Sequence, residues 1–124
     1  MYCVVYTTHM IGKTIRKRRE QLKEKDRKYS LRQVAQRVGL EPAYLSKIER
    51  EEVAPPSEDS IRKIALELDI DPDVLLAMAG KVSSDLLEII CKRPRLLSDL
   101  IRQLKTAPDH AILSVVREVK DGEW

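Results

Sequence analysis

The chain has 124 residues, of which 43% are hydrophobic, 35% charged and only 4% aromatic. That length suits one small domain, or a domain with a short extension, and the few glycines, prolines and aromatic residues argue against a turn-rich all-β fold. No apolar run approaches the roughly 20 residues of a membrane span, segment 1–9 lacks the basic start of a signal peptide, and Cys3 and Cys91 make no disulfide framework. We therefore expect an all-α cytoplasmic protein.

Charge is distributed unevenly along the chain. Residues 11–50 hold 13 Lys/Arg against 5 Asp/Glu, a net of +8, whereas residues 51–124 hold 10 against 15, a net of −5; residues 1–10 hold none, and the total is +3. A segment with such a high density of positive charge attracts polyanions, above all nucleic acid. The alternative for a charge run taken alone is a solvated helix face.

Helical periodicity predicts five amphipathic helices in the first two thirds of the chain. Their starts are marked by residues that cap a helix or suit its first turn: Thr8, Ser30, Pro42, Ser57, and Asp71 with Pro72. Ser30 also forms a capping box with Gln33, Gly39 ends the second helix, and the fifth helix runs to Gly80. The predicted inward-facing residues are Ile11, Ile15, Leu22, Leu31, Val34, Ala35, Val38, Leu45, Ile48, Ile61, Ile64, Ala65 and Leu68.

Three further amphipathic helices are expected in residues 81–124, starting at Ser84, near Pro94 and after Pro108. Their apolar stripes could form the core of the extension, a dimer seam or a groove for a partner. Dimerisation is preferred because each helix has more apolar face than a short terminal extension needs to cover itself. The residues chosen for dimer contacts are Leu97, Leu100, Ile101, Leu104, Ile112 and Val116. Cys91, within an apolar helix, is expected in the core rather than as a redox sensor.

The segment 31–50, LRQVAQRVGLEPAYLSKIER, is the most informative part of the sequence. It describes two short helices joined by a turn, with Ala35 as the small residue where the helices meet. Gly39 supplies the positive φ that the turn requires. This is the pattern of a helix-turn-helix, which lays its second helix in the major groove of DNA.

The outward face of helix 42–49 is small, polar or basic. At about 100° per residue, Lys47 projects nearly opposite Leu45 and Ile48. The candidates for reading base edges are Glu41, Ala43, Tyr44, Ser46 and Lys47. Lys47 can donate to guanine, Ala43 can contact a thymine methyl, and Ser46 can bond a base or the backbone. Glu41 either accepts from cytosine or sits at the positive helix end.

Basic residues around this motif are candidates for the phosphate contacts that fix register on DNA. The candidates are Lys13, Lys17, Arg32 and Arg50, and for each the alternative is a surface cation that contacts only solvent. The charged connection 23–29 could add contacts through Arg27 and Lys28, or could be floppy.

Over roughly residues 10–80 the sequence resembles the phage-repressor (Cro-like, XRE) helix-turn-helix family. The resemblance rests on Val34-Ala35, Val38–Leu40, Tyr44–Arg50, Pro55–Ser57, Ile61–Ala65, Asp71-Pro72 and Leu75–Gly80. It implies a five-helix DNA-binding domain and a structural ion pair between Arg19 and Glu49. The sequence departs from the family at Leu31, where many members have a phosphate-binding glutamine, at Glu41, where many have Ser or Thr, and in its longer connection 23–29.

These features predict three regions: an N-terminal segment 1–9, a helix-turn-helix domain 10–80, and a C-terminal helical extension 81–124 for dimerisation or a partner. The expected function is sequence-specific binding of double-stranded DNA by a homodimeric repressor, with an inverted-repeat operator. An antitoxin-like module that holds a partner protein is the alternative. No catalytic constellation, cofactor motif or metal-ligand spacing is present, and His9 and His110 are far apart in sequence.

Overall fold

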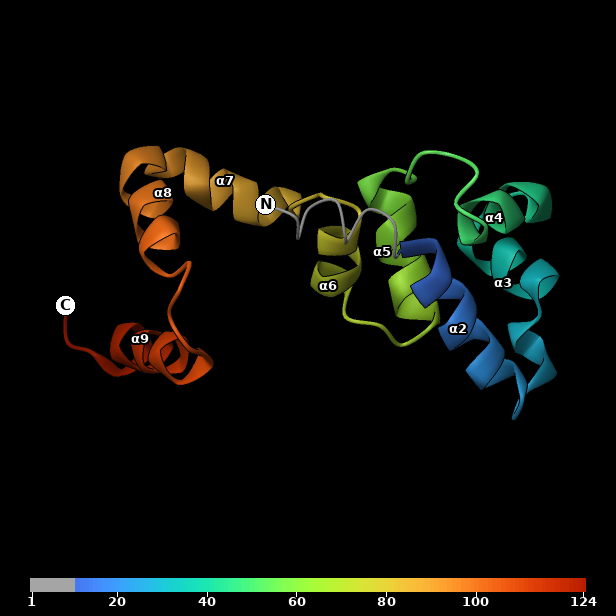
Figure 1. Cartoon of the computed structure of the whole chain (residues 1–124), viewed down its shortest axis with the longest axis horizontal. Coiled ribbons are helices and arrows are strands. Elements are labelled where there is room, and N and C mark those ends of the chain that lie inside the picture. The colour runs from blue at the N-terminus through green and yellow to red at the C-terminus, as the bar shows by residue number, and fades with distance from the viewer. Residues whose placement is uncertain (1–10) are drawn as a thin grey trace. The chain divides into compact units, whose positions relative to one another are not determined.

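The computed structural model describes residues 11–124, so segment 1–9 and the predicted cap at Thr8 lie outside the described residues, as do Cys3 and His9. The described chain is all-helical, as predicted, with the elements α2 (Ile11–Lys23), the 3-10 helix η1 (Arg27–Tyr29), α3 (Leu31–Val38), α4 (Pro42–Glu49), α5 (Glu58–Glu67), α6 (Pro72–Met78), α7 (Ser84–Lys92), α8 (Pro94–Gln103) and α9 (Asp109–Asp121) (Figure 1). The chain divides into two compact units, the first ending at Ser83 and the second starting at Ser84. Among residues 11–124, no helix combines the length and hydropathy of a membrane span.

Side-chain caps set three helix starts in the first unit. In each, an oxygen accepts a backbone N–H of the first turn: Ser30 for α3, Ser57 for α5 and Asp71 for α6. The capping box at Ser30 is only half as predicted, because the Ser30 N–H donates to the Arg27 carbonyl of η1 (3.1 Å) rather than to Gln33. Helix α6 ends at Met78, before the left-handed Gly80 (φ 71°) to which it was predicted to run.

One apolar core joins the five helices of the first unit. Its buried members are Ile11, Ile15, Val34, Ala35, Val38, Leu45, Ile48, Ile61, Ile64, Ala65, Leu68, Leu75, Leu76 and Ala79. Leu22 and Leu31 are half-buried against this cluster. Because both helices of the predicted motif contribute buried residues, α3 and α4 are held in one arrangement by burial that is worth about 1.5–3 kcal/mol for each large side chain.

Helix α2 approaches the end of α4 through Gly12. A Cβ atom at Gly12 would lie 2.4 Å from the Ile48 carbonyl oxygen and 2.9 Å from that of Glu49. Both are backbone atoms, so a side chain at this position would have to push the two helices apart. The close crossing of α2 and α4 therefore requires glycine.

We expect Gly12→Ala to lower the free energy of unfolding by about 1–3 kcal/mol, the usual cost of overpacking a core. Urea denaturation followed by circular dichroism measures the change. The matched control is Gly39→Asn: Gly39 has φ +76° but nothing within 4 Å of a built Cβ, and asparagine tolerates this conformation. Equal costs at the two positions would contradict the steric account of Gly12.

The second unit leaves its apolar side chains uncovered. None of the residues 84–124 is buried. Eleven large apolar side chains are 36–88% exposed: Leu86, Leu87, Ile89, Leu96, Leu100, Ile101, Leu113, Val115, Val116, Val119 and Trp124. The prediction that Cys91 lies in a core is wrong, since the thiol is exposed. Because their apolar stripes are exposed, these helices do not form a core of their own.

Candidate nucleic-acid interface

The turn between α3 and α4 is closed by backbone hydrogen bonds. Gly39 adopts φ 76°, and its N–H donates to the Gln36 carbonyl (3.3 Å), while the Leu40 N–H donates to the Ala35 carbonyl (2.9 Å). Ala35 is fully buried, which lets the two helices meet closely. The pair α3–α4 thus has the left-handed glycine turn and small contact residue expected of a helix-turn-helix.

Helix α4 separates a buried face from an exposed face. Leu45 and Ile48 are 0% and 2% exposed. Of the predicted base-reading residues, four are exposed and one, Ser46, is half-buried; the exposed ones are Glu41, Ala43, Tyr44 and Lys47. Glu41 occupies the N-cap position without a side-chain capping bond, which leaves its carboxylate available at the start of the helix. Among residues 11–124, Lys47 makes no ion pair.

The predicted phosphate contacts come from two helices and from the residue that follows α4, and all four side chains are exposed. Arg32 lies in the first turn of α3, and Arg50 follows α4. Arg50 is already engaged, since its Nη1 lies 2.9 Å from Glu52 Oε2 and its Nε donates to the Ser46 carbonyl (3.3 Å). The structure therefore places Arg32 and Arg50 on the helix-turn-helix itself, with Arg50 held by a local ion pair.

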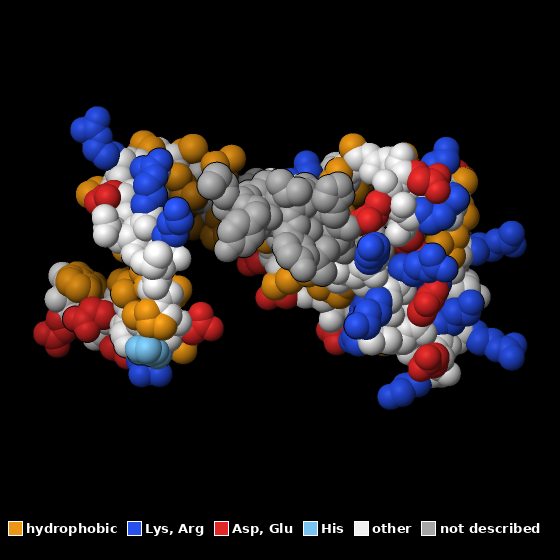
Figure 2. Space-filling view, in the orientation of Figure 1, with side chains coloured by type: hydrophobic (Ala, Val, Ile, Leu, Met, Phe, Trp, Pro, Cys, Tyr) orange, Lys and Arg blue, Asp and Glu red, His pale blue; other side chains and the backbone are white. Residues whose placement is uncertain are grey.

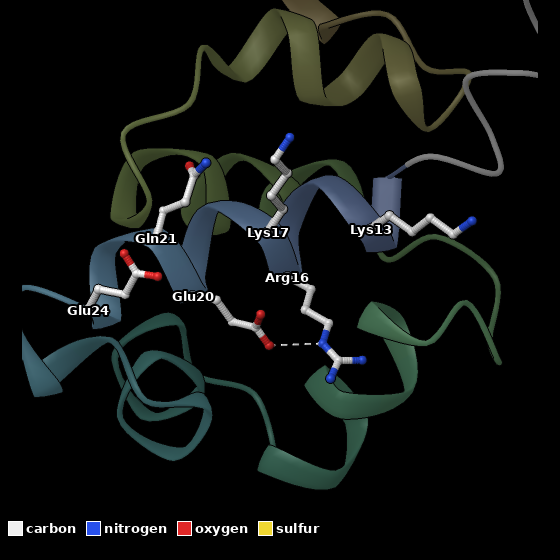
Figure 3. A pocket seen from close by; sticks show the side chains of 6 residues that line it. All are labelled: Lys13, Arg16, Lys17, Glu20, Gln21 and Glu24. Atoms are coloured by element: carbon white, nitrogen blue, oxygen red, sulfur yellow. Dashed lines mark hydrogen bonds and ion pairs between the residues drawn. The ribbon is translucent and has the colours of Figure 1, made fainter.

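Lys13 and Lys17 lie on α2, along an open hollow that Arg16, Glu20, Gln21 and Glu24 also line (Figure 3). Arg16 Nε lies 3.1 Å from Glu20 Oε1, whereas the two lysines extend away from the helix without a partner among the residues drawn. On the face shown in Figure 2, blue side chains gather over the first unit. The structure thus adds exposed cations on α2 to those of the motif.

Arg19 and Glu49 form the ion pair that the family resemblance implies. Arg19 Nε and Nη2 donate to the two carboxylate oxygens of Glu49 at 2.7 and 2.9 Å, and the side chains are only 7% and 3% exposed. The hydrogen bond to Glu49 raises the pKa of the Arg19 guanidinium, against the opposing effect of burial. Arg19 Nη1 also donates to the Tyr29 carbonyl (3.3 Å). One guanidinium therefore joins α2, η1 and the end of α4.

The connection 23–29 contains an ordered turn that the sequence interpretation did not identify. Asp26 accepts the Lys28 N–H (3.0 Å) and starts η1. The Lys28 and Arg37 cations each lie 5.4 Å from the centre of the Tyr29 ring. Arg37 also pairs with Glu67 of α5. An aspartate two residues before a lysine is a weak turn signal, and the contacts of Tyr29 depend on tertiary structure that no local pattern reveals.

The geometry offers an exposed basic and polar helix face rather than an enclosed reaction site. Among the described residues, His, Cys, Asp and Glu side chains do not gather into a group that could hold a metal. Residues 15–75 match the family model described as Helix-turn-helix. No curated protein and no solved structure matches the chain.

Proposed function

Because residues 15–75 belong to the Cro-like (XRE) helix-turn-helix family of DNA-binding transcription regulators, we propose that the protein is a sequence-specific repressor. It binds double-stranded DNA as a homodimer and blocks transcription by occupying a promoter. The operator is an inverted repeat, because a two-fold dimer presents its two reading helices symmetrically.

The exposed face of α4 carries this proposal. Lys47 is exposed and has no ion-pair partner in the described chain, so its ammonium is free to donate to guanine O6 or N7. Glu41, at the start of the helix, accepts from cytosine N4. Ala43, Tyr44 and Ser46 complete the reading face. The core beneath α4 and the Arg19–Glu49 pair hold that face rigid, as base recognition requires.

Phosphate contacts supply the remaining affinity. We assign them to Lys13, Lys17, Arg32 and Arg50. Arg50 exchanges its contact with Glu52 for a phosphate oxygen on binding. That exchange is favourable because an exposed ion pair of this kind is worth at most about 1 kcal/mol, whereas a phosphate contact also releases a counterion from DNA.

We expect Lys47→Ala to relax base preference at one position of each half-site, because the lost contact is worth about 1–3 kcal/mol there. Arg50→Ala serves as the matched control and should weaken all sequences alike, since a phosphate contact carries no sequence information. Selection of bound fragments from random duplex DNA measures both effects. An unchanged selected motif with Lys47→Ala would refute base reading by this residue.

The second unit provides the dimer contacts in this proposal. A unit of 41 residues, Ser84–Trp124, is near the size below which a fold needs a disulfide, a metal or association. The proposed contacts are Leu97, Leu100, Ile101, Leu104, Ile112 and Val116. Leu100, Ile101 and Val116 are 42%, 53% and 54% exposed in the single chain, which is surface that a second copy would remove from water.

The same exposed faces favour one alternative, an antitoxin-like protein whose C-terminal helices hold a different protein. In that case DNA binding would serve autoregulation. Purification of the protein with a stoichiometric partner that dissolves the homodimer would support the alternative over the repressor.

A further inference from the structure

The charges of the second unit are separated by sign. Residues 92–105, which contain α8, hold five Lys/Arg against one Asp, a net of +4. Residues 109–124, which contain α9, hold two Lys/Arg against four Asp/Glu, a net of −2. Every charged side chain in these two ranges is exposed. The unit therefore presents one basic helix and one acidic helix.

These opposite charges do not neutralise one another within the chain. Among the described residues, no ion pair involves a side chain of residues 92–105 or 109–124. The five-residue link 104–108 joins α8 to α9, yet the apolar stripes of both helices remain largely exposed. Within a single chain, therefore, the charges of α8 and α9 stay unpaired and their apolar faces stay exposed.

On α8, basic residues lie at both ends of the apolar stripe. Arg93 is the N-cap residue of α8, and its carbonyl accepts the Leu97 N–H (3.0 Å). Lys105 follows the C-cap residue Leu104, so one cation stands before and one after the stripe that contains Leu97 and Ile101. The stripe of α8 is therefore flanked by positive charge.

On α9 the arrangement has the opposite sign. Asp109, Ile112, Val116 and Val119 follow at intervals of three and four, the spacing of a helical seam. Asp109 stands in the first turn of the helix, and Glu123 lies two residues after its last residue, Asp121. The two stripes have similar lengths, so each end charge on α8 would meet an opposite charge on α9 when the stripes are laid together.

We propose that α8 of one chain docks against α9 of a second copy, and that α9 of the first chain docks against α8 of the second. This pairing rests on the proposed homodimer and gives it a defined interface. A two-fold axis repeats the contact, so both apolar stripes of both chains are covered and all four charged stripe ends are matched. A second copy fits because the two complementary surfaces belong to the same chain.

Charge reversal tests the pairing. In the full chain, Arg93→Glu with Lys105→Glu makes the ends of the α8 stripe acidic, like those of α9, and Asp109→Lys with Glu123→Lys makes the ends of the α9 stripe basic, like those of α8. Each variant alone should dimerise about tenfold more weakly, because like charges then meet at every stripe end. An equimolar mixture should recover the wild-type association constant, because the acidic α8 meets the basic α9, and the basic α8 meets the acidic α9. Sedimentation equilibrium measures each constant.

A matched control uses the other face of α8. Arg95 and Arg102 point away from the stripe at about 100° per residue, and Arg95→Glu with Arg102→Glu makes the same change in net charge. This control should leave dimerisation within about twofold of wild type. Recovery in the mixture also separates lost complementarity from misfolding, since two misfolded chains would not restore one another.

Three results would overturn the pairing: a mixture that associates no better than its components, a control that weakens dimerisation as much as the test variants, or a wild-type chain that stays monomeric. A monomeric wild-type chain would mean that the apolar stripes of α8 and α9 bind another protein or the first unit instead of a second copy. Binding to a single half-site is measured in parallel. If the pairing fails, half-site binding persists; if the proposed function fails, the dimer forms and does not bind DNA.

Discussion

Replacing Arg19 with methionine should lower the free energy of unfolding of the first unit by about 3–5 kcal/mol. The substitution leaves the Glu49 carboxylate, 3% exposed, without the guanidinium that satisfies both of its oxygens. A buried charge without a partner is far more costly than an exposed one. The loss should appear as a lower urea midpoint with an unchanged slope.

Two variants define what this result means. Arg19→Met combined with Glu49→Leu removes both charges and should recover most of the loss, because a buried pair replaced by apolar residues is often neutral. Arg16→Met breaks the exposed pair with Glu20, whose side chains are 56% and 54% exposed, and should cost no more than about 1 kcal/mol. Similar small costs for Arg19→Met and Arg16→Met would show that the buried pair does not hold α2 to α4.

The link to DNA binding follows from where Glu49 stands. It is the last residue of α4, so Arg19 fixes the end of the proposed reading helix. Arg19→Met should therefore weaken DNA binding even in conditions where the first unit remains folded. Arg19→Met combined with Glu49→Leu separates the two effects. It should restore the stability of the first unit, but it lacks the ion pair that fixes the end of α4.

The features of the fold that the sequence predicted correctly are local. Ser57 and Asp71 cap their helices because a short polar side chain can reach the free N–H groups of the first turn. Gly39 ends α3 because glycine adopts positive φ at little cost. The inward residues of α2–α5 are buried, apart from the half-buried Leu22 and Leu31, because their spacing places them on one face of each helix.

The features that were missed depend on contacts between distant segments. The Ser30 N–H donates to the Arg27 carbonyl rather than to Gln33, because the 3-10 helix η1 brings that carbonyl within reach. A 3-10 helix of three residues is too short to leave a periodic pattern in the sequence. Tyr29 holds two cations that come from different elements. The apolar character of its helix predicted a core position for Cys91. An apolar stripe does not reveal whether the residues that pack against it belong to the same chain.

The exposed face of the candidate site was predictable to a similar extent. Helical geometry placed Lys47 on a different face of the helix from Leu45 and Ile48, and Lys47 is exposed while the other two are buried. The ion pair of Arg50 with Glu52 was not foreseen, since it forms in the turn after α4, where helical spacing no longer applies. The local ion pair of Arg50, a proposed phosphate contact, is thus visible only in the structure.

A steep loss of DNA affinity with salt is the second large effect that we expect. The motivation is the net charge of +8 over residues 11–50, together with the exposure of the four proposed phosphate contacts. If a dimer neutralises about six to ten phosphates, the counterions released from DNA should make affinity fall on the order of a thousandfold between about 50 and 200 mM salt. Arg32→Gln should make the dependence shallower by about one counterion for each chain bound.

The most direct test of the central claim is therefore a titration of the full-length protein with its selected duplex at several salt concentrations. We expect a straight line of log affinity against log salt, with a steep negative slope that Arg32→Gln reduces. An affinity that stays flat over this range, or a slope that Arg32→Gln leaves unchanged, would contradict binding of DNA through the basic surface of the first unit.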